Sequence, residues 1–187
     1  MSDAIVRDLA ASDIDAVTAI YAESVANGRG TFELDPPEAG EMAARLAAVT
    51  ALGLPCLVAE LDRAVAGYAY VGPFRMRQAY RYMVEDSIYV APPARGRGVA
   101  GVLLDALIMR CTAMGLRQMV AVIGDAENLG SVALHRSRGF VDAGGFTAAG
   151  WKHDGWRDVI FMQRPLADGG RTPPDAPGLS LADKTLS

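Results

Sequence analysis

The chain of 187 residues is 51% hydrophobic and carries a formal net charge of -4. This length is enough to bury a sizeable core in one domain and is too short for two ordinary domains. The acidic balance argues against nonspecific binding to nucleic acid or to anionic membranes, so we expect neither partner and a local role for each arginine.

Hydrophobic periodicity predicts a series of short strands and helices. In the first half of the chain it indicates a strand over 5–8, a helix capped by Ser12 and broken at 28–30, a helix from 35–37 to Gly53, a hairpin of strands over 56–61 and 65–71, and an adjacent strand over 82–90. In the second half it indicates a helix over 99–114, a strand over 119–123, a helix over 128–138, and two strands flanking the turn 152–155. The helix over 99–114 is apolar nearly all round, so we expect it to be buried against a sheet.

The composition changes near the end of the chain. From about Asp168 onward Gly, Pro, Asp and Ser predominate, and no apolar period is present. We therefore predict one domain over residues 1–166 and a mobile tail over residues 167–187.

The cysteines and the first residues give no sign of export or of metal binding. Cys56 and Cys111 lie in apolar segments without C-x-x-C spacing, so we expect both to be reduced core residues and expect no metal site. The first four residues lack the basic and apolar regions of a secretory signal, and no run of about 18 apolar residues occurs. We expect a soluble cytoplasmic protein.

A glycine-rich turn between the strand over 82–90 and the next helix is the most informative motif. It reads Arg95-Gly96-Arg97-Gly98-Val99-Ala100-Gly101. Amides at a helix start lack intrahelical acceptors, and with the helix dipole they favour a phosphate. Gly96 and Gly98 let a pyrophosphate approach the main chain, while Arg95 and Arg97 add mobile positive charge. The turn predicts a phosphate-bearing cofactor.

Three interpretations of this turn compete. Gly96, Gly98 and Gly101 satisfy the dinucleotide pattern G-x-G-x-x-G, with Asp125 as a ribose-binding acid, which would make the protein an NAD-binding oxidoreductase. An ordinary strand-to-helix turn is the second interpretation. The third is the acetyl-coenzyme A signature Arg/Gln-x-x-Gly-x-Gly/Ala, met by Arg95, Gly98 and Ala100, and here the chain resembles the GCN5-related N-acetyltransferases (GNAT). A dinucleotide domain normally begins with its glycines, whereas here they follow an apparent antiparallel meander.

A second segment strengthens the resemblance. Residues 128–140 contain Asn128, Ser131 and a Gly-Phe pair at family-like positions, with His135 where the family often has a tyrosine that protonates the departing thiolate. A histidine that only packs on a helix face is the alternative. Residues 31–33, 72–80, 84–90, 120–124 and 150–158 resemble the phosphinothricin and methionine sulfoximine acetyltransferase subfamily.

The resemblance implies a mixed α/β fold of the α+β type, with a central, mostly antiparallel sheet that is splayed at the cofactor site and covered by helices on both faces. It also implies acetyl-CoA as co-substrate. The residues it assigns to acetyl-CoA are Ile88, Tyr89, Val90, Arg95, Gly96, Arg97, Gly98, Val99, Ala100, Gly101, Asn128 and Ser131.

Acetyl transfer to an amine needs a base, a polarised carbonyl and a way to stabilise the leaving thiolate. Glu85 and Asp86 fall on opposite faces of a strand, and an unpartnered buried carboxylate is costly, so we expect at least one to have a function. The subfamily resemblance selects Glu85 as general base; an edge strand with a solvated face is the alternative. His135 either protonates coenzyme A sulfur or serves as the base, and the sequence leaves both roles open.

Substrate choice is assigned to the loop that precedes the strand over 82–90. The guanidinium groups of Arg75 and Arg77 suit a carboxylate, phosphinate or sulfonyl oxygen, although surface arginines are equally compatible with the spacing. The predicted substrate-binding residues are Phe32, Glu33, Arg75, Met76, Arg77, Glu85, Asp86 and Ser87.

The subfamily resemblance implies N-acetylation of a small amino-acid-like substrate such as phosphinothricin, methionine sulfoximine or methionine sulfone. A coenzyme A-binding module without catalysis is a further alternative. The resemblance also implies a homodimer, in which Trp151, Lys152 and Trp156 could reach a neighbouring subunit's site, while either tryptophan could equally be core.

Overall fold

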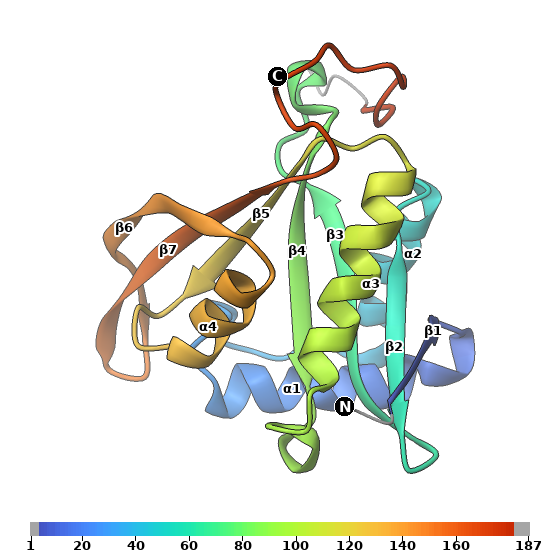
Figure 1. The fold of residues 1–187 in the computed structure, drawn as a ribbon. Helices are drawn as coiled ribbons and strands as arrows, with labels where there is room; N and C mark the ends of the chain where they lie inside the picture. Colours follow the sequence, from blue (N-terminus) through green and yellow to red (C-terminus); the bar gives the residue numbers. More distant parts are fainter. Residues whose placement is uncertain (1–3, 182–187) are drawn as a thin grey trace, which may run out of the picture.

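A computed structural model of the protein describes residues 4–181. Seven strands form one sheet in the order β1-β2-β3-β4-β5-β7-β6 (Figure 1). The strands are β1 Ile5–Asp8, β2 Cys56–Leu61, β3 Ala64–Pro73, β4 Met83–Val90, β5 Gln118–Gly124, β6 Val141–Lys152 and β7 Gly155–Pro165. The α-helices are α1 Ile14–Asn27, α2 Ala39–Ala51, α3 Val99–Ala113 and α4 Leu129–Ser137. The predicted order of strands and helices is confirmed.

Helices cover both faces of the sheet, as predicted. On one face α3 places Leu103 and Leu107 in a core cluster with Leu57 of β2. On the other face α1 and α2 pack on a second cluster that contains Val58 of β2 and Tyr68 of β3. Leu57 and Val58 are neighbours in β2 and enter different clusters because successive strand residues point to opposite faces. Among residues 4–181, no helix is both long and apolar enough to cross a membrane.

The sheet opens between β4 and β5, which are its only parallel neighbours within residues 4–181. Their pairing runs from Met83 opposite Gln118 to Asp86 opposite Ala121 and then stops, although both strands continue. Figure 1 shows the two strands diverging beyond this point. The predicted splay is therefore confirmed, and it exposes the second half of β4 along one edge.

Two helix starts differ from the predictions. Ser12 lies in a 3-10 turn, and Asp13 precedes α1 with a carboxylate that accepts from the Ala10 amide at 2.8 Å, so Ser12 does not cap the helix. Helix α2 begins at Ala39, later than the expected Asp35-Pro36-Pro37 start. A proline disfavours the helical conformation in the residue before it, and Pro37 acts in this way on Pro36.

Residues 167–181 differ from the predicted mobile extension. Leu179 and Leu181 are buried in the α3-side core cluster. The Tyr82 hydroxyl donates to the Ala176 carbonyl at 2.8 Å, and the Arg117 guanidinium donates to the Thr172 carbonyl at 3.0 Å. This segment packs on the body of the domain, so the expected boundary at 166 is not a break in packing. The remaining tail, residues 182–187, lies outside the described residues.

Both cysteines are buried and free, as predicted. Burial raises the pKa of the Cys56 thiol and of the Cys111 thiol to about 12. A thiol must ionise to act as a nucleophile, so these two residues contribute to packing and not to chemistry.

Candidate active site

An open cleft of about 1180 Å3 occupies the gap between β4 and β5. Its walls come from the segment after α1, from β4, from the turn before α3 and from the start of α4. The predicted site residues that line it are Phe32, Glu85, Asp86, Ser87, Ile88, Tyr89, Val90, Arg95, Gly96, Gly98, Ala100, Gly101, Asn128, Ser131 and His135. Residues from four separate parts of the sequence thus meet in one cavity.

Six predicted site residues lie outside this lining, namely Glu33, Arg75, Met76, Arg77, Arg97 and Val99. Val99 is buried in the core cluster, because the first turn of α3 directs its side chain toward the sheet. The guanidinium of Arg75 lies 4.5 Å from the centre of the Phe74 ring and donates to the Phe74 carbonyl at 3.2 Å. The structure of the single chain does not bring the Arg75–Arg77 loop to the wall of the cleft.

The turn before α3 presents main-chain amides to the cleft. Gly96 and Gly98 have φ values of 74° and 82°, in the left-handed region that glycine adopts without strain. Gly98 precedes the helix, and its carbonyl accepts from Gly101 at 3.1 Å. Within residues 4–181, the amides of Gly98, Val99 and Ala100 have no backbone acceptor. They form a set of donors of the kind that binds phosphate at a helix start.

The two arginines of this turn are already paired. Arg95 donates to Glu23 at 2.5 Å, and Arg97 donates to Asp62 at 3.0 Å. The predicted mobile positive charge is therefore partly neutralised by acidic partners, and the amides are the donors that remain.

Sequence reasoning missed other cleft residues, among them Tyr70 and two arginines. Arg138 lines the cleft so close to Gly101 that an added Cβ at Gly101 would lie 2.3 Å from its Nη2 atom. Arg29 also lines the cleft, 3.7 Å from the Asp125 carboxylate. Each arginine directly precedes a glycine, which is a signal too common to single them out.

Glu85 lies on the α1- and α2-side of β4, where it pairs with Gly72 of β3. Asp86 points to the opposite face, as predicted. Burial, reinforced by the charge of Asp86, raises the pKa of the Glu85 carboxyl, while the charge of Arg75 opposes the rise. A carboxylate in the wall of a cleft with a raised pKa is suited to accept a proton near neutral pH.

His135 and Asp86 form a buried pair on the other face. The His135 Nε2 atom lies 3.0 Å from Asp86 Oδ2, and its Nδ1 atom lies 2.8 Å from the Ser131 carbonyl oxygen. A carbonyl only accepts, so Nδ1 carries a proton, and an ionised Asp86 requires a second proton on Nε2. Burial favours neutral His135, yet the hydrogen bond and charge of Asp86 outweigh it and raise the pKa of His135. This arrangement favours the protonated imidazole and engages both ring nitrogens.

The start of α4 fixes the other cleft wall. Asn128 precedes the helix, and its side-chain oxygen accepts from the Ser131 amide at 3.2 Å. This cap orients α4, whose first turn brings Ser131 to the cleft and whose last turn brings His135 to the cleft and to Asp86.

The β6–β7 hairpin contacts the segment after α1 that lines the cleft. Lys152 is buried, and its ammonium donates to the Thr31 carbonyl at 2.9 Å. Burial lowers the pKa of Lys152, and the charge of Glu33 opposes this effect. Trp151 and Trp156 are exposed and in edge-to-face contact at 5.5 Å, so the expectation that either is a core residue is wrong.

The strand arrangement excludes the dinucleotide alternative. The glycine turn follows three antiparallel neighbours, β2, β3 and β4, and within residues 4–181 only β4 and β5 pair in parallel. A dinucleotide domain requires an open, mostly parallel sheet with its glycines after the first strand. Asp125, the expected ribose-binding acid, lies instead near the guanidinium groups of Arg29 and Arg157.

Comparisons with known proteins agree with this fold. The model of the acetyltransferase (GNAT) family matches residues 19–140. A phosphinothricin N-acetyltransferase of Alcaligenes faecalis is 47% identical over 171 residues, which cover 91% of this chain and 85% of the relative. An L-methionine sulfoximine/L-methionine sulfone acetyltransferase of Pseudomonas paraeruginosa is 38% identical over 86% of this chain and 94% of the relative.

A solved structure extends the comparison to three dimensions. The crystal structure of a GNAT superfamily phosphinothricin acetyltransferase from Sinorhizobium meliloti, in complex with AcCoA, is 51% identical to this chain. The match has a TM-score of 0.90 and covers 93% of this chain and 94% of that one. The splayed sheet, the helix-start amides and the similarity along nearly the whole sequence lead to one conclusion: the chain belongs to the acetyltransferase (GNAT) family.

Proposed function

We propose that the protein transfers the acetyl group of acetyl-CoA to the amine of a small amino-acid-like substrate, such as methionine sulfone, methionine sulfoximine or phosphinothricin. The observation that carries this proposal is a single cleft lined both by the glycine turn, whose amides lack backbone acceptors, and by the half-buried Glu85. The names of the relatives support the substrate class.

Acetyl-CoA supplies an activated thioester, and the residues around the cleft fit its charged and polar parts. The amides of residues 98–100 would hold the pyrophosphate, because they lack backbone acceptors at a helix start. Arg138, adjacent to Gly101, adds a guanidinium that the sequence did not reveal, although Asp105 pairs with it at 3.3 Å. The exposed edge of Ile88, Tyr89 and Val90, beyond the last β4–β5 pair, would bind the pantetheine arm as an added strand does.

Glu85 is the proposed general base. Its carboxylate takes a proton from the substrate ammonium, directly or through one water, and the freed lone pair attacks the acetyl carbon. A main-chain amide within residues 88–90 polarises the carbonyl oxygen. His135 acts as a cation beside the leaving sulfur; Asp86 and the Ser131 carbonyl engage both of its ring nitrogens, which argues against His135 as the base.

The predicted substrate contacts divide into three groups. Phe32 and Ser87 line the cleft with Glu85, which supports contact with the acceptor. Asp86 also lines the cleft, but it lies on the opposite face of β4 and is paired with His135. Glu33 and the loop residues Arg75, Met76 and Arg77 lie outside the lining, so their role requires the loop to move or a second subunit to complete the site. Acetylation of such analogues would detoxify them.

A thiol-release assay tests the proposal. We expect coenzyme A to be freed when acetyl-CoA is mixed with methionine sulfone, sulfoximine or phosphinothricin, and the N-acetyl product to appear by mass spectrometry. No release with any of these amines would overturn the acetyltransferase function. Binding of acetyl-CoA without release would identify a coenzyme A-binding module instead.

A cytoplasmic location stays a prediction from the sequence.

We also propose that the protein forms a homodimer. Phe146, Trp151 and Trp156 expose large aromatic surfaces on the β6–β7 hairpin, which is typical of a protein interface. We expect the protein to sediment as a dimer and Trp156→Glu to shift it toward monomer, because a buried unpaired carboxylate is costly. Monomeric sedimentation of the unmodified protein at about 50 μM would contradict the dimer.

A further inference from the structure

The loop between β3 and β4, residues 74–82, lies against the segment that follows β7. It carries the predicted substrate residues Arg75, Met76 and Arg77, which lie outside the cleft lining. Figure 1 shows the red segment after β7 beside this green loop. We call residues 176–181 of that segment the strap.

Hydrogen bonds from the strap hold the loop in place. The Leu179 amide donates to the Arg81 carbonyl at 2.8 Å, and the Gln78 side-chain amide donates to the Leu181 carbonyl. Within the part of the chain that the structure describes, all other hydrogen bonds of residues 75–81 stay inside the loop. The strap therefore supplies the hydrogen bonds that fix these residues to the body of the domain.

The strap and the loop are also closely packed. The Tyr82 hydroxyl donates to the Ala176 carbonyl at 2.8 Å. Gly178 has a φ of 72°, and an added Cβ there would lie 2.8 Å from both the Arg81 carbonyl oxygen and a Tyr82 ring carbon. A larger residue at position 178 would therefore push the strap away from the loop.

The other side of the strap is anchored in the domain. Leu179 and Leu181 are buried in the α3-side core cluster. Just before the strap, the carbonyls of Thr172 and Pro173 each accept from the guanidinium of the buried Arg117 at 3.0 Å. The strap thus connects the loop to the core.

Arg75 brings a charge of the loop close to the proposed base. Gly72 pairs with Glu85, and the Phe74 amide donates to the Met83 carbonyl at 3.3 Å, so Arg75 directly follows the last bond between β3 and β4. The contacts of its guanidinium with the ring and carbonyl of Phe74 do not neutralise it. Its charge lowers the pKa of the Glu85 carboxyl, against the larger effect of burial.

We propose that the strap is a positioning element of the active site, which holds the loop so that the Arg75 guanidinium stays close enough to stabilise the ionised carboxylate of Glu85. The inference deepens the proposed function, on which it rests for the role of Glu85 as base. A base must be ionised to accept a proton. Residues that do not line the cleft would thus help to set the lowest pH at which the enzyme works.

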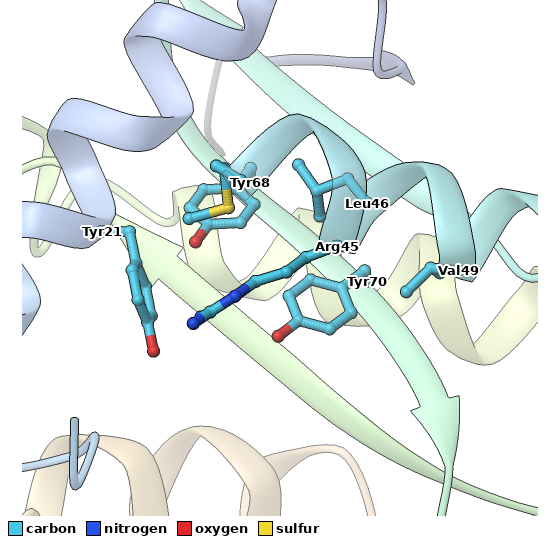
Figure 2. A pocket seen from close by; sticks show the side chains of 7 residues that line it. Tyr21, Arg45, Leu46, Val49, Tyr68 and Tyr70 are labelled. Carbon is cyan, nitrogen blue, oxygen red and sulfur yellow. The ribbon is translucent and has the colours of Figure 1, made fainter. Parts of the chain in front are cut away.

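The other charged and titratable groups around Glu85 do not lie on the loop that the strap holds. They are Asp86 in β4, Tyr70 in β3, Tyr21 in α1, and Arg45 in α2 with its partners Glu33 and Glu41. Figure 2 shows Arg45 between Tyr21 and Tyr70. The β5 residue opposite Glu85, Val120, carries no charge. Moving the strap should therefore affect Glu85 through Arg75.

Carbon-13 NMR titration of the Glu85 carboxyl, assigned by its loss in Glu85→Gln, tests the inference without requiring turnover. Gly178→Ala and Arg75→Gln should each raise the titration midpoint by at least about 0.3 pH unit, because each removes a nearby positive charge. Gly178→Ala should add no further rise in the Arg75→Gln protein. Gly170→Ala is the matched control, since Gly170 is exposed with open space around its Cβ, and it should leave the midpoint unchanged.

An unchanged midpoint in Gly178→Ala, or a further rise when it is added to Arg75→Gln, would overturn the inference. If Gly178→Ala fails to fold, Gln78→Ala combined with Tyr82→Phe removes both side-chain hydrogen bonds to the strap and should raise the midpoint in the same way. In the thiol-release assay, the acid limb of the kcat/KM profile should move to higher pH in these variants. The expected titrations without thiol release from any amine would reject the proposed function and leave the coupling of strap and loop in place.

Discussion

Glu85 illustrates how the environment of one side chain sets its chemistry. Burial and the neighbouring charge of Asp86 both disfavour its ionised form and raise the pKa of its carboxyl. The group must be deprotonated to act as a base, so kcat/KM should fall as the pH drops through this raised pKa.

Glu85→Gln removes the proton acceptor and nearly preserves the shape of the side chain. We expect kcat to fall by about 10²–10⁴, with the KM for acetyl-CoA little changed. The thiol-release assay measures both constants. Glu38→Gln, at an exposed position before α2, is the matched control and should behave as the unmodified protein. A Glu85→Gln enzyme with full kcat would assign the base elsewhere.

The Asp86–His135 pair predicts a pH dependence of stability. The pKa of His135 is raised above 6.5 in the folded state. The contribution of the pair to the free energy of unfolding is therefore fully present below about pH 6.5 and is lost as the pH rises through the folded-state pKa. Asp86→Asn should flatten this dependence and cost about 3–5 kcal/mol, since it leaves a buried partner unpaired.

Chemical denaturation between pH 5.5 and 9 measures the effect of Asp86→Asn. Asp142→Asn breaks an exposed pair with Arg136 and should cost no more than about 1 kcal/mol. Equal losses of unfolding free energy in the two variants would show that the buried Asp86–His135 pair stabilises the protein no more than the exposed pair does.

The predictability of the site differs from residue to residue. The opposite orientations of Glu85 and Asp86 follow from strand alternation, and the family resemblance pointed to His135. Arg138 and Tyr70 could not be identified in this way, because their approach to the cleft depends on how distant elements pack. The pairing of Arg95 with Glu23 likewise joins residues 72 positions apart.

At the scale of elements, the glycine turn and the splay act together. The turn could be predicted because two glycines and a helix start are local features of sequence. The end of the β4–β5 pairing at Asp86 could only be inferred from the family, since no local pattern marks where two strands separate. The start of α2 at Ala39 was missed because the proline pair suits a first turn as well as the extended segment it forms.

Gly98→Ala tests the turn. A Cβ at a φ of 82° costs about 1–2 kcal/mol, and relief of this strain would move the amides that precede and open α3. We expect the Kd for acetyl-CoA to rise about tenfold or more by calorimetry. Gly40→Ala in α2 has open space around its Cβ and ordinary φ, so it should leave the affinity unchanged. Normal affinity in Gly98→Ala would argue against a role for this turn.

At the scale of the whole molecule, residues 167–181 complete the core instead of extending from it. Their Gly- and Pro-rich composition hid two buried leucines, because single apolar residues in an irregular segment leave no periodic signal. Leu179→Ala should lower the free energy of unfolding by about 2–5 kcal/mol, and the exposed Leu34→Ala should have little effect. Urea denaturation measures the free energy of unfolding of both variants. Equal values for Leu179→Ala and Leu34→Ala would mean that residues 167–181 do not contribute to stability.

In the proposed mechanism, one cleft aligns acetyl-CoA on the glycine turn with an amine at Glu85. A crystal structure with coenzyme A and methionine sulfone tests it most directly. We expect the diphosphate on the amides of residues 98–100 and the amine nitrogen within hydrogen-bond reach of the Glu85 carboxylate, directly or through one water. Coenzyme A bound away from this turn, or an amine directed away from Glu85, would contradict it.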